Sequence, residues 1–343
     1  MALIRSDFNF VNKPWWRLDY DDRAPQDFLS STKCFQQAIL LSVNKEDELF
    51  WLGYIDFHRE RYLIECISAE GDIGLDVIRQ LLKKSWFKVF LSNIREIMFP
   101  RINFDPFSRL ASFICRKVLG NYIHRIIFGP SRSSHLAKKV QNLRNTINGI
   151  FPTIFFPDLP IDRFTPLLAK QLHQQVGNGL IDNAGQYRTR YVMSAQDNYV
   201  YLAPNLIENK MEVLFRQCRQ NFRREGLELE EAIKFGACFL AHFLDIHPFI
   251  NGNGRVARLL LSYLLSRFTV VPLSLYSGAK TQDVFLQCLR EVTCFHEQPS
   301  ALASFILENI HTTSYDICTI MDIDVQNNNN KCIILAHICK RMP

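Results

Sequence analysis

Apolar residues recur at every third or fourth position along most of the chain, a spacing that is typical of amphipathic helices packed on a core. Two such stretches lie within residues 26–66, and a third covers residues 164–176. Further stretches with the same spacing lie near residues 205–222, 228–245, 254–268, 281–294 and 299–312. The pattern therefore predicts a mainly α protein with an N-terminal helical region.

Three segments depart from this helical pattern. Tyr and Val alternate on both sides of "SAQDN", which predicts a β-hairpin over residues 188–201. "FGPSRSS", residues 128–134, predicts a linker, and the "NNNN" run at 327–330 predicts local disorder. We divide the chain accordingly into a helical region, a basic aromatic-rich segment, a main domain and a partly disordered tail, over residues 1–80, 81–150, 155–315 and 316–343.

The composition is that of a globular protein and excludes several other classes. Of the 343 residues, 48% are apolar and 22% are charged. No apolar run reaches the length of a membrane-spanning helix, and the N-terminus lacks the apolar core of a secretory signal. The ten cysteines include no C-x-x-C pair, so we expect reduced thiols and a cytoplasmic protein.

The formal net charge of +6 is concentrated in one part of the chain. Residues 81–147 contain thirteen Lys and Arg but only Glu96 and Asp105 on the acidic side. Solvated faces of amphipathic helices explain such a segment, and so does a docking surface for an acidic partner, nucleic acid or an anionic membrane. The sequence leaves both interpretations open.

The stretch "HPFINGNGRVAR", residues 247–258, combines the features of an anion-binding site. Pro248 disfavours helix at His247, and the glycines that follow permit a tight loop that opens a new helix. Such a loop points backbone N–H groups at an anion at the positive end of the helix dipole. Arg255 and Arg258 are three residues apart and so lie on one face near that end. The imidazole of His247 is placed to accept a proton from an incoming hydroxyl.

This stretch resembles the signature H-P-F-x-[D/E]-G-N-G-R-x-x-R of the Fic family, and the resemblance extends over roughly residues 160–312. The segment "NAGQYR", residues 183–188, is similar to the family's lead into its hairpin, called the flap. The resemblance implies a Fic-type helical bundle that transfers AMP from ATP to a Ser, Thr or Tyr hydroxyl of a target protein, with release of pyrophosphate.

The resemblance implies roles for individual residues by position. His247 corresponds to the general base, Phe249 to the residue that anchors the loop in the core, and residues 188–201 to the flap that holds the target segment. The phosphate-binding residues implied in the same way are Gly252, Asn253, Gly254, Arg255 and Arg258.

Two residues depart from the family pattern. Asn251 stands where most members have the Asp or Glu that binds Mg²⁺, so this metal position is expected to be weak. Glu291 stands where members often have an Asn that contacts the nucleoside. ATP as co-substrate and Mg²⁺ are therefore implied by the resemblance, while the donor specificity stays open.

Many Fic proteins carry an inhibitory helix, [S/T]-x-x-x-E-[G/N], whose Glu pairs with the second arginine of the signature. "CISAEG", residues 66–71, resembles the N-terminal form of this helix and makes Glu70 the preferred inhibitory residue. "SFILEN", residues 304–309, matches the motif literally and makes Glu308 the alternative.

Three functions follow from these patterns. The first is a protein adenylyltransferase inhibited through Glu70, acting on a target protein, with the chain itself as one candidate target. The second keeps the fold but transfers another phosphate-containing group or removes AMP. The third is a nucleotide-sensing interaction module with little turnover. The sequence leaves the oligomeric state open.

Overall fold

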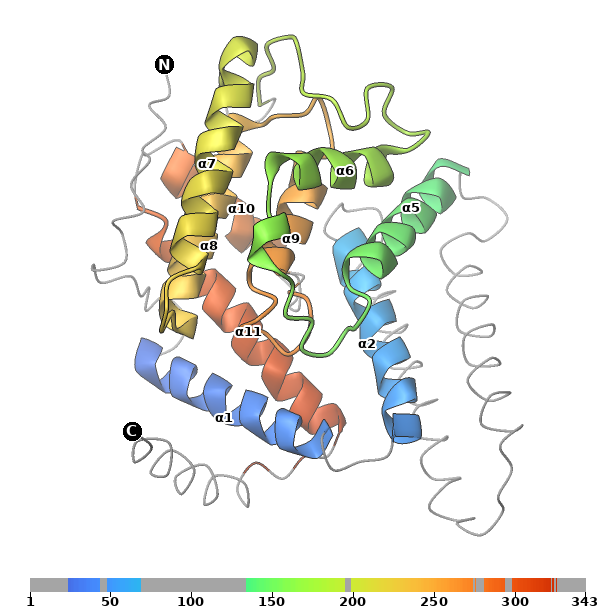
Figure 1. Cartoon of the computed structure of the whole chain (residues 1–343), viewed down its shortest axis with the longest axis vertical. Coiled ribbons are helices and arrows are strands. Elements are labelled where there is room, and N and C mark those ends of the chain that lie inside the picture. The colour runs from blue at the N-terminus through green and yellow to red at the C-terminus, as the bar shows by residue number, and fades with distance from the viewer. Residues whose placement is uncertain are drawn as a thin grey trace. The chain divides into compact units, whose positions relative to one another are not determined.

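Figure 1 shows the chain as a computed structural model. The structure describes residues 24–43, 48–68, 134–194, 199–273, 275, 281–293, 298–321, 323 and 325. Glu70, the greater part of the basic region and the asparagine run at 327–330 lie outside these residues. The predicted domain boundaries stay predictions.

The described part of the chain is mainly α-helical, which confirms the predicted fold class. The helices agree closely with the apolar periodicity of the sequence. They are α1 (Pro25–Val43), α2 (Glu48–Ser68), α5 (Ser134–Ile150), α6 (Pro166–Gly177), α7 (Ile207–Phe222), α8 (Leu229–Ile246), α9 (Asn253–Leu264), α10 (Thr281–Thr293) and α11 (Ser300–Ile320), with short 3₁₀ turns η2 (Ile161–Arg163) and η3 (Pro204–Leu206). None of the described helices is long and apolar enough to cross a lipid bilayer.

The chain forms two compact units, Met1–Ser31 with Gln141–Thr313 and Thr32–Val140 with Ser314–Pro343. In the first unit, α8 packs against α7 and α9, and α9 packs against α6. Helix α8 is buried on nearly every side, as its almost continuous apolar sequence predicts. The charge of Lys234 is balanced within the same helix by Glu230, 2.8 Å away.

Aromatic rings fill the core of this first unit. The ring of Phe164 lies against Phe215, Phe239 and Tyr263, with centroids 4.7, 5.0 and 5.8 Å apart. Helix α6 starts directly after Phe164, because the Thr165 hydroxyl accepts a hydrogen bond from the Leu168 N–H at 3.4 Å. This core fixes the positions of α8 and α9, which the signature stretch at 247–258 connects, and of α6, which packs against α9.

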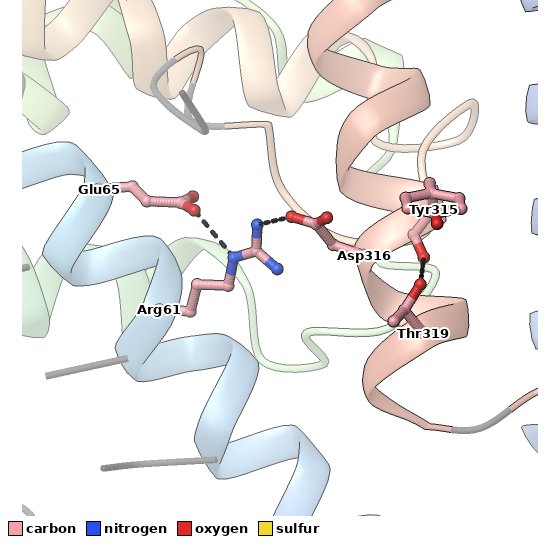
Figure 2. A network of polar contacts seen from close by, with 5 residues as sticks. All are labelled: Arg61, Glu65, Tyr315, Asp316 and Thr319. Carbon is pink, nitrogen blue, oxygen red and sulfur yellow. Dashed lines mark hydrogen bonds and ion pairs between the residues drawn. The ribbon is translucent and has the colours of Figure 1, made fainter. Parts of the chain in front are cut away.

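A buried ion pair organises part of the second unit (Figure 2). Arg61 of α2 is bonded to Glu65 one turn later at 2.8 Å and to Asp316 of α11 at 2.7 Å. Helix α11 consequently continues to Ile320, whereas the periodicity predicted an end near residue 312. The residues that open the predicted tail are therefore helical, and two of them, Ile317 and Cys318, are buried.

The predicted β-hairpin at 188–201 is wrong as a pair of strands. Among the described residues of this segment, a single antiparallel bridge joins Met193 and Val200. Residues 195–198, between them, are outside the description. Two backbone hydrogen bonds flank this bridge, from the Ser194 N–H to the Tyr199 carbonyl at 2.8 Å and from the Tyr201 N–H to the Val192 carbonyl at 3.2 Å. A two-stranded ribbon without a third strand is only marginally stable, and the side chains of Tyr199 and Tyr201 contact the end of α8. We call residues 188–202 the flap segment.

Candidate active site

His247 ends helix α8 in an unusual backbone conformation. Its N–H still donates to the Phe243 carbonyl at 3.1 Å, but its φ of 47° and ψ of 60° lie in the left-handed region. Pro248 prevents helical continuation at this position. A non-glycine residue in this region is strained and needs support from its surroundings, a situation that is common at functional sites.

The loop after His247 is fastened to the core by Phe249 and Asn253. The Phe249 ring is fully buried and stacks on the imidazole of His173, with centroids 3.9 Å apart. The Asn253 side chain accepts from the Phe249 N–H at 2.9 Å and donates to the Phe249 carbonyl at 2.8 Å. Both ends of that amide thus help to close the loop.

The loop leads into the N-terminus of α9, where the two signature arginines gather. Gly252 caps α9 with a φ of 78°, which glycine adopts without strain. A Cβ atom on Gly252 would lie 3.6 Å from Nη2 of Arg255, and one on Gly254 would lie 3.3 Å from Nη1 of Arg258. Both largely buried guanidinium groups therefore lie close to the glycine backbone at the positive end of α9. This arrangement suits a polyphosphate.

Asn251 is exposed at the mouth of the loop. Its Oδ1 accepts a hydrogen bond from the Gly252 N–H at 2.7 Å. Its backbone carbonyl lies 3.0 Å from Nε2 of His173. The Asn251 side chain is therefore folded against the next residue of the chain.

His173 of α6 is a site residue that the sequence analysis missed. Its Nδ1 accepts from the Gly185 N–H at 2.8 Å, so its Nε2 carries the proton and donates to the Asn251 carbonyl. Burial lowers the pKa of His173 to about 4; the bond to Asn251 acts in the opposite direction and the charge of Arg255 lowers it further. A neutral ring with one donor and one acceptor thus joins α6 to the loop. The available signal was its place on the apolar face of α6, beside Leu172 and Val176.

Arg188 is the second residue that was missed, although it closes the quoted "NAGQYR" segment. Its backbone N–H donates to the Pro248 carbonyl at 2.9 Å, and its guanidinium donates to the carbonyls of His247 at 2.8 Å and Ile246 at 3.3 Å. On the other side, it donates to the carbonyls of Arg190 and Leu202, at the two ends of the flap segment. This 5% exposed side chain connects the flap segment to the strained end of α8.

The imidazole of His247 lies under the flap segment. Its ring stacks on Tyr201 with centroids 3.9 Å apart, and the neighbouring Tyr199 hydroxyl donates to Asp245. Burial lowers the pKa of His247 to about 4; the Leu244 carbonyl acts in the opposite direction and the charge of Arg188 lowers it further. His247 is consequently neutral at pH 7 and able to accept a proton.

Comparison with known proteins agrees with this geometry. A sequence model of the Fic/DOC family matches residues 163–265. A Fido domain-containing protein from Dictyostelium discoideum is 32% identical over 141 residues, which are 39% of this chain and 91% of that protein. The chain belongs to the Fic/DOC family. The ribonucleoside-diphosphate reductase small chain of Ostreid herpesvirus 1 is 28% identical over 131 residues, which cover 34% of this chain and 22% of that longer protein.

Solved Fic structures share the fold. A Fic family protein from Desulfovibrio desulfuricans G20 has a TM-score of 0.53 at 13% identity, covering 90% of this chain and 77% of its own. A fragment of Fic-1 from C. elegans has a TM-score of 0.55 at 15% identity, covering 87% of this chain and 72% of its own. At these identities the likeness shows the Fic fold alone.

The Fic signature residues from His247 to Arg258 occupy the end of α8, the loop after it and the first turns of α9. The other candidate residues come from elsewhere in the chain. Glu291 lies in α10 and Glu308 in α11, both half-buried, while Glu70 falls outside the described residues, shortly after the end of α2.

Proposed function

We propose that this Fic protein transfers AMP from ATP to a hydroxyl side chain of a target protein. The observation that carries the proposal is the pairing of a neutral, half-buried imidazole at the end of α8 with two guanidinium groups at the glycine-capped N-terminus of α9, joined by one short loop. The first group suits proton transfer and the others suit a polyphosphate. The target is a Ser, Thr or Tyr, and the chain itself is one candidate.

The reaction needs one bond formed and one broken at the α-phosphorus. The target hydroxyl oxygen attacks the α-phosphorus, its proton passes to the imidazole of His247, and the bond from the α-phosphorus to the bridging β-oxygen breaks. AMP remains on the target, and pyrophosphate leaves. Because the pKa of His247 is about 4, the ring is unprotonated at neutral pH and can receive this proton as the new bond forms.

The loop and α9 supply the groups for the phosphates. The backbone N–H groups that follow Gly252 point along the positive end of α9, where they suit the α-phosphate on which charge develops. Arg255 and Arg258 suit the β- and γ-phosphates through paired guanidinium contacts. Phe249 and Asn253 hold the loop in place, which agrees with the anchoring role proposed for Phe249.

Magnesium fits this site only through the nucleotide. The described residues contain no group of three His, Cys, Asp or Glu that would hold a metal ion. The one candidate protein ligand, Oδ1 of Asn251, carries no charge and already accepts from the Gly252 N–H. Mg²⁺ commonly takes most of its ligands from phosphates and water and would there neutralise phosphate charge.

Inhibition by a glutamate that faces Arg258 is part of the proposal. A carboxylate in that position would compete with the γ-phosphate for the same guanidinium. Glu70 is the preferred residue and Glu308 the alternative, and the region 81–147 is proposed as a contact for an acidic partner. We place the reaction in the cytoplasm, where ATP is plentiful and thiols stay reduced.

A different donor is the second candidate function. Two residues favour it. Asn251 lacks the negative charge that would bind the Mg²⁺ of a nucleoside triphosphate. Glu291 stands where an amide side chain is expected to contact the nucleoside. The chemistry at His247 would be the same, because any phosphate-containing donor needs a deprotonated acceptor hydroxyl.

One experiment separates these functions. The intact mass of the chain and of added cell proteins is measured after incubation with ATP, UTP or CDP-choline, with His247→Ala as the control for transfer that needs the base. A mass increase equal to AMP with ATP alone supports the proposal. An increase only with another donor supports the second candidate, and no increase with any donor leaves an interaction module.

A further inference from the structure

Two Asn-Gly pairs follow one another in the signature loop, and the fold treats their side chains in opposite ways. Asn253 is 2% exposed, and both ends of its amide are bonded to Phe249. Asn251 is exposed, and its Oδ1 lies 2.7 Å from the backbone nitrogen of Gly252. In an Asn-Gly pair this nitrogen meets no steric obstacle in approaching the side-chain amide carbon, because glycine has no Cβ.

We propose that Asn251 is a site of spontaneous modification at which the folded loop converts its own amide into a carboxylate. The backbone nitrogen of Gly252 loses its proton to hydroxide and attacks Cγ of Asn251. A carbon–nitrogen bond forms, the side-chain nitrogen takes a proton from water and leaves as ammonia, which regenerates the hydroxide, and a five-membered succinimide remains. Water then opens either carbonyl of this ring, which gives aspartate or isoaspartate, with no change in oxidation state.

The local geometry favours this step. The hydrogen bond from Gly252 to Oδ1 holds the attacking nitrogen beside the side-chain carbonyl before any reaction. Gly252 also caps α9, so its amide lies in the positive field of the helix N-terminus.

Arg255 strengthens the same effect, because its Nη2 lies 3.6 Å from the place where a Gly252 side chain would begin. A positive field favours loss of the Gly252 proton. It also stabilises the oxyanion that forms on Oδ1 during the attack.

The product changes the charge of the site. Aspartate at 251 adds a negative charge next to the two arginines and provides the hard carboxylate oxygen that Mg²⁺ prefers. Isoaspartate adds the same negative charge and also inserts a methylene group into the backbone of residue 251, directly before the N-cap of α9. This functional consequence rests on the proposed function, whereas the modification itself does not.

Other Asn-Gly pairs of the chain serve as internal references. Asn148 lies in the last turn of α5, where the helix fixes its backbone. Asn178 is exposed after α6, but its carbonyl accepts from the Asn142 side chain at 2.7 Å. Exposure alone would therefore select Asn148, Asn178 and Asn251 equally, while the contact between Oδ1 and the next backbone nitrogen selects Asn251.

The chemical test follows all of these pairs in one sample. The full chain is kept at physiological temperature and mildly alkaline pH, then digested, and each asparagine is read by fragment masses as amide or acid, with isoaspartate separated by electron-transfer fragmentation. We expect the amide to be lost at 251 first, and similar rates at all pairs when the chain is unfolded in urea. Loss at 178 that matches or exceeds 251, or a folded chain in which 251 reacts no faster than 253, would overturn the proposal.

A second arm tests the consequence for activity. Asn251→Gln blocks ageing, because its longer side chain closes a six-membered ring far more slowly, and Asn251→Asp represents one end product. Aged wild type should shift its Mg²⁺ dependence toward that of Asn251→Asp, and aged Asn251→Gln should not shift. If residue 251 is modified but the Mg²⁺ dependence of transfer does not shift, the proposed effect of the modification on metal binding is wrong. Absence of transfer in every form refutes the proposed function and leaves the chemical arm standing.

Discussion

Two buried arginines, one in each compact unit, are hydrogen-bonded to different kinds of partner. Arg61 is 7% exposed and is paired with the carboxylates of Glu65 and Asp316 (Figure 2). Arg188 is 5% exposed, and its hydrogen bonds go to backbone carbonyls at the end of α8 and in the flap segment. Carbonyls at a helix C-terminus carry the negative end of the dipole and so suit a cation.

The difference indicates what each arginine does. A carboxylate pair ties two helices together and leaves nothing for a ligand. Carbonyl bonds leave the charge of Arg188 in the site, beside His247, and fix the backbone on which that base is carried. We therefore expect the Arg61 network to govern stability and the Arg188 network to govern reaction geometry.

His247→Ala should show the largest effect on transfer. Loss of a general base typically lowers the rate by about 10²–10⁴-fold. ATP binding should be largely retained, because the base acts on the hydroxyl. Initial rates of label transfer from α-labelled ATP and equilibrium ATP binding measure the two quantities, and near-normal transfer would show that His247 is not the base.

Arg61→Met should have the largest effect on stability and leave transfer per folded molecule unchanged. The substitution leaves Glu65 buried without its cation, and breaking such a pair costs about 3–5 kcal/mol. Urea unfolding measures the loss, and the double variant Arg61→Met, Glu65→Leu should recover part of it. If Arg61→Met unfolds at the same urea concentration as the wild type, Arg61 does not stabilise the fold as proposed.

Arg188→Met should lower transfer by roughly 10²-fold with a small change in the KM for ATP, because a small displacement of a catalytic group costs about that much. Hydrogen exchange should rise together over residues 189–202 and 244–252. Arg188→Lys should recover only part of the rate, since an ammonium cannot reach both segments.

Arg219→Met is the matched control for this variant, because it removes one arginine–carbonyl bond, to Phe164, away from the loop. If hydrogen exchange becomes faster in the flap segment alone, Arg188 does not hold the backbone at His247, and its proposed role in reaction geometry is wrong.

Glu70→Gly should raise self-modification and tighten productive ATP binding. Glu70 is proposed to act on Arg258 as Glu65 and Asp316 act on Arg61, and ATP must displace it. Coupling of this kind typically changes affinity by roughly 5- to 150-fold.

Glu308→Gly, assayed beside it, is the control. Activation by Glu308→Gly alone would assign the inhibition to α11, and activation by neither variant would remove it.

Asn251→Asp should have the smallest effect, a higher transfer rate at limiting Mg²⁺ that disappears when the metal is in excess. The added carboxylate supplies a charged ligand for Mg²⁺ where the wild type has an uncharged amide. Rates are compared over a Mg²⁺ series and after chelation. Superimposed curves for freshly prepared wild type and variant would show that residue 251 does not contact the metal.

The sequence predicted most of the helices and the signature loop because both depend on local patterns. Apolar periodicity specified α8 and α9, and Pro248 with Gly252 specified the break between them. Arg188 and His173 were missed because their partners are backbone groups of residues distant in sequence, which leave no trace in side-chain identity.

The two errors in the fold have the same origin. Helix α11 extends to Ile320 because Asp316 meets Arg61, a residue 255 positions away. The hairpin alternation places the side chains of Tyr199 and Tyr201 on the end of α8, while the pairing of the described residues is limited to one bridge and its neighbouring hydrogen bonds.

The two hydrogen bonds between Asn253 and Phe249 have a consequence for the entropy of ligand binding. A flexible glycine loop would have to be ordered when a phosphate arrives, and the entropy lost would weaken binding. Here the amide of Asn253 occupies both backbone groups of Phe249, so the turn is ordered when the chain folds. Calorimetry of nucleotide binding should accordingly show little loss of conformational entropy from this loop.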